Sequence, residues 1–259
     1  MPQLFITTSW DDGHPLDLRL AELLARYGLP GTFYVPRRAS QAVITEAQLR
    51  ELAKAFEVGA HTLSHVVLPG VADSVAEREI RDSKTYLEDL LGRPVPMFCL
   101  PRGRFRARHV RMLARAGFLG ARTTELFSLR PPVRRDGIAL LPTSIQAYPH
   151  GPVSYLRNFA RRLAWGNLGC YLQLNAGRQW TRTAAALLGR AAERGGVFHL
   201  WGHSWEVEAY NQWSQLEDVF RFMNEQKPGA QPLSNGEICD SVSRGAAGPG
   251  GEPGGRLEG

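Results

Sequence analysis

Cysteine is scarce in this chain of 259 residues, which has only Cys99, Cys170 and Cys239 and no C-x-x-C pair. An odd number of widely separated cysteines argues against a disulfide framework and against a zinc site built on thiolates. The chain also lacks the ~20 consecutive apolar residues that a membrane helix needs. Its N-terminus has no basic segment of the kind that opens a secretory signal. We therefore expect reduced thiols, a cytoplasmic location and no membrane association.

Lysine is nearly absent as well. Only three of the 31 basic residues are lysines, and the other 28 are arginines, which leaves a net charge of +6. Because arginine binds carboxylates and phosphates with two hydrogen bonds, an anionic substrate or a nucleic acid is one interpretation. The arginines are spread along the chain instead of forming one basic run, and a codon bias would give the same composition. We expect no nucleic-acid partner, and the oligomeric state is not indicated.

Apolar residues are plentiful, at 43% of the chain, so a large core is expected. No break in composition divides the first 240 residues, which fits one domain of about 250 residues or less. Residues 241–259 are rich in glycine and proline and have little to bury, so we expect a flexible tail there.

Short apolar strands alternate with amphipathic helices along residues 4–223. For example, Leu16, Leu20, Leu23, Leu24 and Tyr27 fall on one helical face. The predicted strands are Leu4–Thr8, Thr32–Val35, Glu57–His61, Val95–Leu100, Phe118–Thr123, Ile138–Leu141 and Val197–Trp201. The predicted helices are Glu46–Phe56, a long helix ending near Gly92, Arg106–Ala116, Val153–Trp165, Thr181–Arg194 and a closing helix around Trp213–Met223.

This alternation predicts an α/β fold with a parallel sheet, either closed into a barrel or doubly wound. In a (β/α) barrel the carboxyl ends of the strands meet at one rim, where active sites lie. Polar residues follow four of the predicted strands at that end. The sequence therefore predicts one site built from four distant segments.

The first segment contains Asp11 and Asp12, two adjacent carboxylates at the end of a strand. They repel each other unless they point in different directions, in which case one can bind a metal while the other handles a proton. A solvated Asp-Asp-Gly turn is the alternative interpretation.

The second segment contains His61 and His65, whose spacing would place both rings on one face of a helical turn, where they could share a metal. Two incidental histidines beside a helix cap are the alternative.

The third and fourth segments are less specific. Pro101-Arg102-Gly103 is a turn that could present a backbone N–H to an oxyanion, or an ordinary turn. His203 follows the last predicted strand, where a proton donor would be placed, although a buried histidine bonded to backbone fits the same pattern.

Together these segments resemble the polysaccharide deacetylase family, also called the NodB homology domain or carbohydrate esterase family four. The similarity spans residues 4–239. The matching segments are Ser9–Gly13 (SWDDG), His61–His65 (HTLSH), Cys99–Gly103 (CLPRG) and Leu200–His203 (LWGH).

The resemblance implies a distorted (β/α)7 barrel and a divalent metal, most often Zn²⁺. It implies these roles: Asp12, His61 and His65 as metal ligands, Asp11 as general base, His203 as general acid, and the backbone N–H of Arg102 at the oxyanion. The sequence departs from the family at Cys99, where the family has an arginine that steers the base. Arg102 and Arg104 are the candidates to supply that charge, and the sequence leaves open whether either does. The family's fourth motif has no clear match, and Trp205 and Glu206 are the candidates for its role.

The implied activity is metal-dependent removal of an N-acetyl group from an amino sugar or glycan. Two alternatives remain open: hydrolysis of another small or cyclic amide, and a degenerate barrel that binds glycan without catalysis. A sugar face could stack on Trp10, Trp201 or Trp205, although large aromatic side chains are equally usual in barrel packing. His14 is a further expected substrate contact, and Tyr148 and His150 are weaker ones.

Overall fold

The structure is a computed structural model, and it describes residues 3–162, 165–174 and 179–245. One sheet organises these residues. Its strands are β1 (Leu4–Asp11), β2 (Thr32–Val35), β3 (Glu57–Ala60), β4 (Met97–Cys99), β5 (Gly120–Arg122), β6 (Val133–Arg135), β7 (Ile138–Leu141), β8 (Ile145–Gln146), β9 (Gly196–Gly202) and β10 (Ala230–Pro232).

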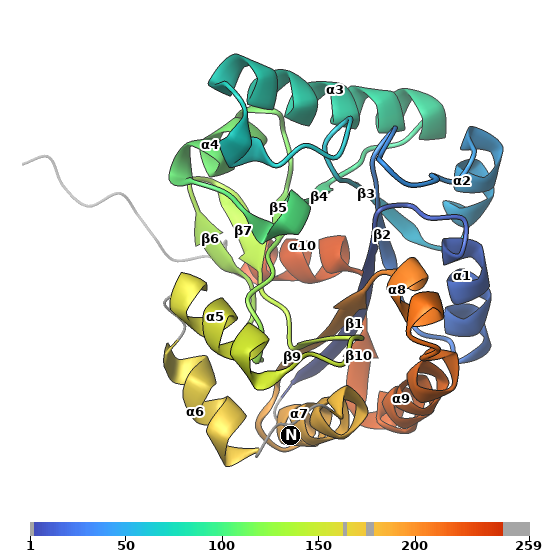
Figure 1. The fold of residues 1–259 in the computed structure, drawn as a ribbon, viewed down its shortest axis with the longest axis vertical. Helices are drawn as coiled ribbons and strands as arrows, with labels where there is room; N and C mark the ends of the chain where they lie inside the picture. The colour runs from blue at the N-terminus through green and yellow to red at the C-terminus, as the bar shows by residue number, and fades with distance from the viewer. Residues whose placement is uncertain (1–2, 163–164, 175–178, 246–259) are drawn as a thin grey trace, which may run out of the picture.

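The strand order is β6-β7-β5-β4-β3-β2-β1-β9-β8, and β10 pairs with the first half of β1. All pairs are parallel except the β6–β7 hairpin. The sheet curls into a half-barrel with most helices around its outer side, while α10 lies within the curve of the sheet, against β1, β5 and β7 (Figure 1). The predicted α/β barrel class is confirmed. Among the described residues, no strand pairing joins the end strands β6 and β8.

Helices connect the strands and cover the sheet. They are α1 (Asp17–Arg26), α2 (Glu46–Leu52), α3 (Asp73–Leu91), α4 (Ala107–Arg115), α5 (Pro152–Arg162), α6 (Trp165–Gln173), α7 (Trp180–Arg194), α8 (Ser204–Ala209), α9 (Trp213–Glu225) and α10 (Asn235–Gly245). The apolar stripe predicted for α1 is buried at Leu20, Leu23 and Leu24. Helix α3 ends at Gly92, whose φ of 63° suits a residue without a Cβ.

Strands β1 and β9 are neighbours in the sheet, and they pair over seven residues, from Leu4–Gly196 to Trp10–Gly202. Both strands are buried along almost their whole length because they are covered on both faces, and the polar side chains on their inner face, such as Ser9 and His199, bond to each other there. In parallel strands all carboxyl ends point the same way. Asp11, the residues after Ala60 and His203 therefore reach one rim.

Several short elements differ from the sequence prediction. Strands β6, β8 and β10 and helices α6, α8 and α10 are not predicted, because most are too short for a periodic pattern to emerge. The predicted tail at residues 241–259 lies outside the described residues from 246 onward, and α10 covers its first five positions.

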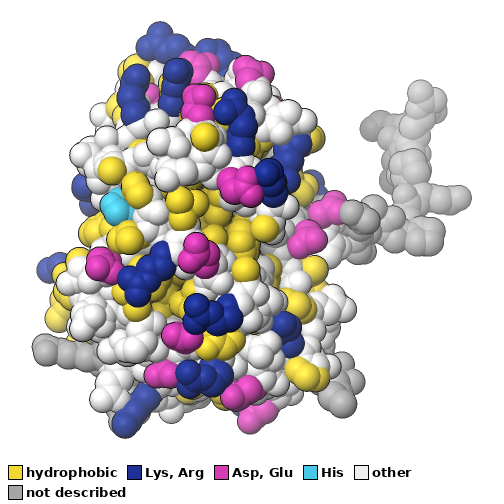
Figure 2. All heavy atoms as spheres, turned by 90° about the vertical axis from the view of Figure 1, so that its right-hand side faces the viewer, with side chains coloured by type: hydrophobic (Ala, Val, Ile, Leu, Met, Phe, Trp, Pro, Cys, Tyr) yellow, Lys and Arg dark blue, Asp and Glu magenta, His cyan; other side chains and the backbone are white. Residues whose placement is uncertain are grey.

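The surplus of arginine does not collect into one patch on the face turned to the viewer in Figure 2. Lys and Arg side chains alternate there with Asp and Glu around a strip of hydrophobic side chains (Figure 2). In the part of the chain that the structure describes, no helix combines the length and apolarity that crossing a membrane requires.

Candidate metal centre

The two adjacent aspartates at the end of β1 diverge because the chain turns sharply after Asp11. Asp12 has a φ of 79° and Gly13 a φ of 61°. Position 13 also has to be glycine because an added Cβ would lie 2.7 Å from a methyl carbon of Val35. The two carboxylates consequently meet different partners, as the repulsion between them required.

Asp12 points toward the histidine pair. Its Oδ1 atom lies 3.1 Å from Nε2 of His65 and 3.5 Å from Nε2 of His61. The histidines do not lie on a helical turn, which corrects the prediction from their spacing. They follow β3 in an irregular segment, and positive φ angles at Thr62 (59°) and His65 (54°) turn both rings toward Asp12.

Hydrogen bonds fix the orientation of these ligands. His61 donates from Nδ1 to the carbonyl oxygen of Cys99 at 2.9 Å, which directs Nε2 toward Asp12. The other carboxylate oxygen of Asp12, Oδ2, accepts hydrogen bonds from Nε2 of Gln41 at 2.8 Å and Nε1 of Trp205 at 3.0 Å. Burial alone would raise the pKa of Asp12, but the contacts with His61 and His65 lower it, so the carboxylate is ionised.

The residues fit a divalent metal ion. Oδ1 of Asp12 is buried and makes no hydrogen bond within the described residues, while two imidazole nitrogens face it. Ligand atoms of Asp12, His61 and His65 all lie within 4.8 Å of one another. Two imidazoles and one carboxylate are a donor set that suits zinc and leaves positions open for water or substrate.

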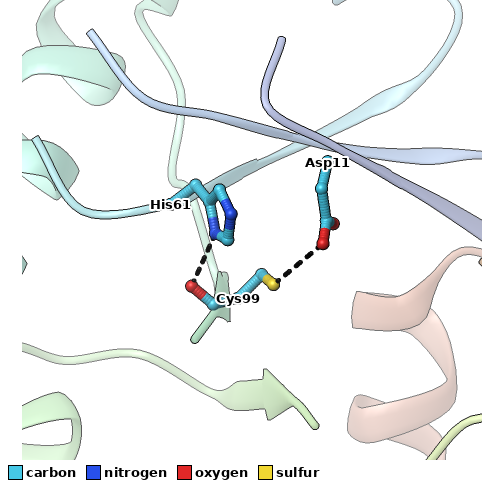
Figure 3. A group of neighbouring side chains, drawn as sticks. All are labelled: Asp11, His61 and Cys99. Atoms are coloured by element: carbon cyan, nitrogen blue, oxygen red, sulfur yellow. Dashed lines mark hydrogen bonds between the residues drawn. The ribbon is translucent and has the colours of Figure 1, made fainter. Parts of the chain in front are cut away.

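Asp11, His61 and Cys99 form a second cluster, in which one potential ligand atom of each residue lies within 4.8 Å of the others. Figure 3 shows why it is a poor metal site: the Nδ1 atom of His61 is already bonded to the Cys99 carbonyl. The Cys99 thiol donates to Oδ2 of Asp11 at 3.6 Å, and burial raises its pKa well above the usual range. Cys99 is therefore a neutral hydrogen-bond partner of Asp11, and the metal set contains Asp12 instead.

Asp11 is paired with a residue that the sequence analysis missed. Arg122 on β5 is fully buried and bonds through Nη2 to Oδ1 of Asp11. On the question left open by the sequence, the structure shows that neither Arg102 nor Arg104 but Arg122 supplies the charge beside Asp11. An arginine within the predicted strand Phe118–Thr123 was the available signal, since a buried guanidinium needs an anionic partner.

His203 stands on the other side of the carboxylates, at the N-cap of α8. Its Nε2 lies 3.9 Å from Oδ2 of Asp11 and 3.8 Å from Oδ2 of Asp12, and its Nδ1 lies 2.6 Å from Oε2 of Glu206. Burial alone would lower the pKa of His203, but the hydrogen bond to Glu206 and the charges of both aspartates raise it to about 9. The ring is thus protonated at neutral pH, as a proton donor must be.

Glu206 connects His203 to a chain of polar side chains. Gln146 on β8 donates from Nε2 to Oε2 of Glu206 at 2.9 Å. The amide oxygen of Gln146 lies 2.8 Å from Nε2 of His150. Of the two residues considered for the missing fourth motif, Glu206 is therefore the one that contacts His203 through a hydrogen bond, while Trp205 bonds to Asp12.

A cavity of about 470 Å³ opens over these groups. Its lining includes the ligands together with Asp11, His203, Arg102, Trp201, Trp205 and His150. The φ of Arg102 is 54°, so the turn at this position is left-handed.

Two expected substrate contacts lie elsewhere. Trp10 is fully buried, packs edge-on against Phe220 and donates from Nε1 to Thr8. It belongs to the core because the residue before Asp11 on the strand faces the opposite way. His14 does not line the cavity; its Nδ1 accepts a hydrogen bond from the backbone N–H of Leu16.

Residues 2–121 match a family model described as polysaccharide deacetylase. The resemblance to this family is confirmed. No curated protein matches the chain.

Solved structures of polysaccharide deacetylases share the fold over nearly the whole chain. A protein from Mycobacterium smegmatis assigned to them is 16% identical, with a TM-score of 0.67 over 99% of this chain and 96% of its own. A probable polysaccharide deacetylase from Pseudomonas aeruginosa is 12% identical, with a TM-score of 0.68 over 93% and 91%. An allantoinase is 10% identical, with a TM-score of 0.64 over 96% and 92%. At these identities the likeness concerns the fold.

Proposed function

We propose that this protein is a zinc-dependent deacetylase that removes an N-acetyl group from an amino sugar or glycan. The observation that carries the proposal is the meeting of Asp12, His61 and His65 around one unsatisfied carboxylate oxygen, with Asp11 and His203 on either side. The match of residues 2–121 to the polysaccharide deacetylase model supports the same class of reaction.

The three ligands would hold the cation at the rim of the half-barrel. When bound, it would supply Lewis-acid polarisation of a carbonyl oxygen and lower the pKa of water in the site. Asp11 is the general base: Arg122 bonds to its Oδ1, which keeps its pKa low against the opposing effect of burial. Its Oδ2, 3.9 Å from His203, is the oxygen that accepts the proton of the attacking water.

His203 is the general acid. Its protonated Nε2 gives a proton to the departing nitrogen, which would otherwise be a poor leaving group. The backbone N–H of Arg102, on the turn at the cavity wall, is the donor for the oxyanion, and such a donor contributes about 3 kcal/mol. Trp201 and Trp205 form apolar parts of the wall against which a sugar face would pack.

A second candidate is hydrolysis of a small or cyclic amide other than an N-acetyl sugar. The cavity volume of about 470 Å³ is in the range of pockets that bind small molecules. An allantoinase has the same fold. Fold and metal do not fix specificity, so the substrate has to be measured.

The test measures acetate release from N-acetylglucosamine oligomers beside ammonia or amine release from a panel of small and cyclic amides, using enzyme of known zinc content. We expect acetate release by the wild type and loss of at least 1,000-fold, on the order of a missing base, in Asp11→Asn. His61→Ala should lose zinc and activity together. Turnover restricted to the amide panel would favour the second candidate. Equal background rates for wild type and Asp11→Asn on every substrate would leave a non-catalytic barrel.

A further inference from the structure

Arg122 and Cys99 face each other across two strands. In the β4–β5 pair these residues are direct partners in the register. Paired residues on neighbouring strands project from the same face of the sheet, so both side chains enter the interior of the half-barrel. Both are fully buried.

The two side chains converge on one carboxylate. Arg122 bonds to Oδ1 of Asp11, while the Cys99 thiol donates to Oδ2 from 3.6 Å. Strand β5 is separated from β1 by β4, β3 and β2, so the guanidinium reaches Asp11 across the interior of the curled sheet. It passes the Trp201 ring at 4.5 Å and the Tyr34 ring at 5.6 Å, which fix its path.

This arrangement is unfavourable for stability alone. Arg122 uses one nitrogen on Asp11, and its buried Nε and Nη1 make no hydrogen bond within the described residues. A buried ion pair with unsatisfied donors is weak as a stabilising device. Its evident effect is to hold the Asp11 carboxylate in one orientation, with Oδ1 on Arg122 and Oδ2 on the side of His203.

The geometry points to Arg122 as the positioning residue for Asp11, and to Cys99 as the small partner that leaves room for it. The inference rests on the proposed function, because it assigns Arg122 to the base of that reaction. A long side chain at position 99 would enter the space between β4 and Asp11 that the guanidinium and the thiol now share. In this chain the guanidinium beside Asp11 therefore comes from β5, and the paired position on β4 holds a small thiol.

This assignment can be tested with four proteins: wild type, Cys99→Arg, Arg122→Cys, and the double variant with both changes. We expect each single change to lower kcat about 100-fold, since a small misplacement of a reacting group has an effect of that size. Adding Cys99→Arg to Arg122→Cys should raise kcat at least tenfold, although the same change is harmful in the wild type. KM and zinc content should stay within about twofold throughout. Arg108→Met, which removes an arginine paired with Asp73 on helix α3, is the matched control and should leave kcat unchanged.

An unchanged kcat in Arg122→Cys, or a double variant no more active than Arg122→Cys, overturns the inference. Should Arg122→Cys fail to fold, Arg122→Lys replaces it: the charge remains but the forked geometry is lost. We then expect a kcat loss of at least tenfold with an unfolding midpoint near that of the wild type, and an unchanged kcat overturns the inference.

Failure of the proposed function itself looks different, because the wild type then hydrolyses no amide. In that case a double-mutant cycle of Asp11→Asn and Arg122→Lys, read by urea unfolding, decides. The inference is supported if the equilibrium constant for unfolding of the double variant is at least fivefold smaller than the sum of the two single effects predicts. Additive effects overturn it.

Discussion

Asp12 shows how a single side chain divides its two oxygens between different tasks. Oδ1 faces His61 and His65, while Oδ2 is held by Gln41 and Trp205. The hydrogen bonds from Gln41 and Trp205 to Oδ2 orient Oδ1 toward the histidines. We therefore predict that Gln41→Ala weakens zinc binding by 10- to 100-fold, the usual effect of removing a hydrogen bond that orients a metal ligand. Competition with a chelating dye measures the affinity. Gln231→Ala, an exposed change on β10, should leave it unaltered. Equal affinity in Gln41→Ala and wild type would contradict the role given to Gln41.

Asp17 is a buried carboxyl that the proposed chemistry does not use. Burial raises its pKa to about 8 against the hydrogen bond from Ser204. The folded state therefore holds a proton that the unfolded chain, with a pKa of about 3.9, releases. The free energy of unfolding then falls as pH rises between these two values, by at most about 1.4 kcal/mol per pH unit. Asp17→Asn removes this dependence and should flatten the profile. Urea unfolding at about pH 5, 6 and 7 checks this, with exposed Asp218→Asn as control. Parallel profiles for wild type and Asp17→Asn would show that Asp17 is ionised when folded.

Helix α8 determines the state of the proposed acid. His203 caps the helix, and one turn later Glu206 returns to bond its Nδ1. Loss of the Glu206 charge lowers the pKa of His203, which is about 9 with it. Since the acid has to be protonated, the basic limb of the kcat/KM profile should move to lower pH in Glu206→Gln, with kcat reduced 10- to 100-fold at neutral pH. Glu208→Gln on the same helix breaks only the contacts with Arg19 and Trp213. It should leave the limb in place, and a profile shared by all three proteins would rule out control through Glu206.

The elements that the sequence predicts well are those with a clear apolar period. The strands at Thr32–Val35 and Ile138–Leu141 have the predicted ends, because both are short apolar runs between turns. The predicted helical turn at His61–His65 was wrong, since the same spacing also fits an irregular loop with two positive φ angles, which is what the structure has. Arg122 could be placed on its strand, but not opposite Asp11: its partner lies 111 positions away and is set by the curl of the sheet.

Across the whole molecule, the site exists because parallel strands end together. Its groups follow β1, β3 and β9, and the register of these strands sets the level at which each group stands. Periodicity and strand-end chemistry predict this gathering of groups at one rim. They do not predict which side chains near the rim belong to the core, and Trp10 is an example, because one residue along a strand reverses the direction of the side chain.

Metal binding should therefore stabilise the entire fold. The ligands link the loop after β1 with the loop after β3, and without a cation the buried Oδ1 of Asp12 has no hydrogen-bond partner among the described residues. Ligand binding to the folded state alone adds RT ln(1 + [L]/Kd), which is about 2.7 kcal/mol at a free zinc concentration 100 times Kd. We expect the unfolding midpoint of chelator-treated protein to rise with each increment of zinc. His150→Ala, which alters the cavity wall outside the ligand set, should retain the rise, and His61→Ala should abolish it. A midpoint that zinc does not move in the wild type would exclude these three side chains as a metal site, because a cation held by two distant loops necessarily resists their separation.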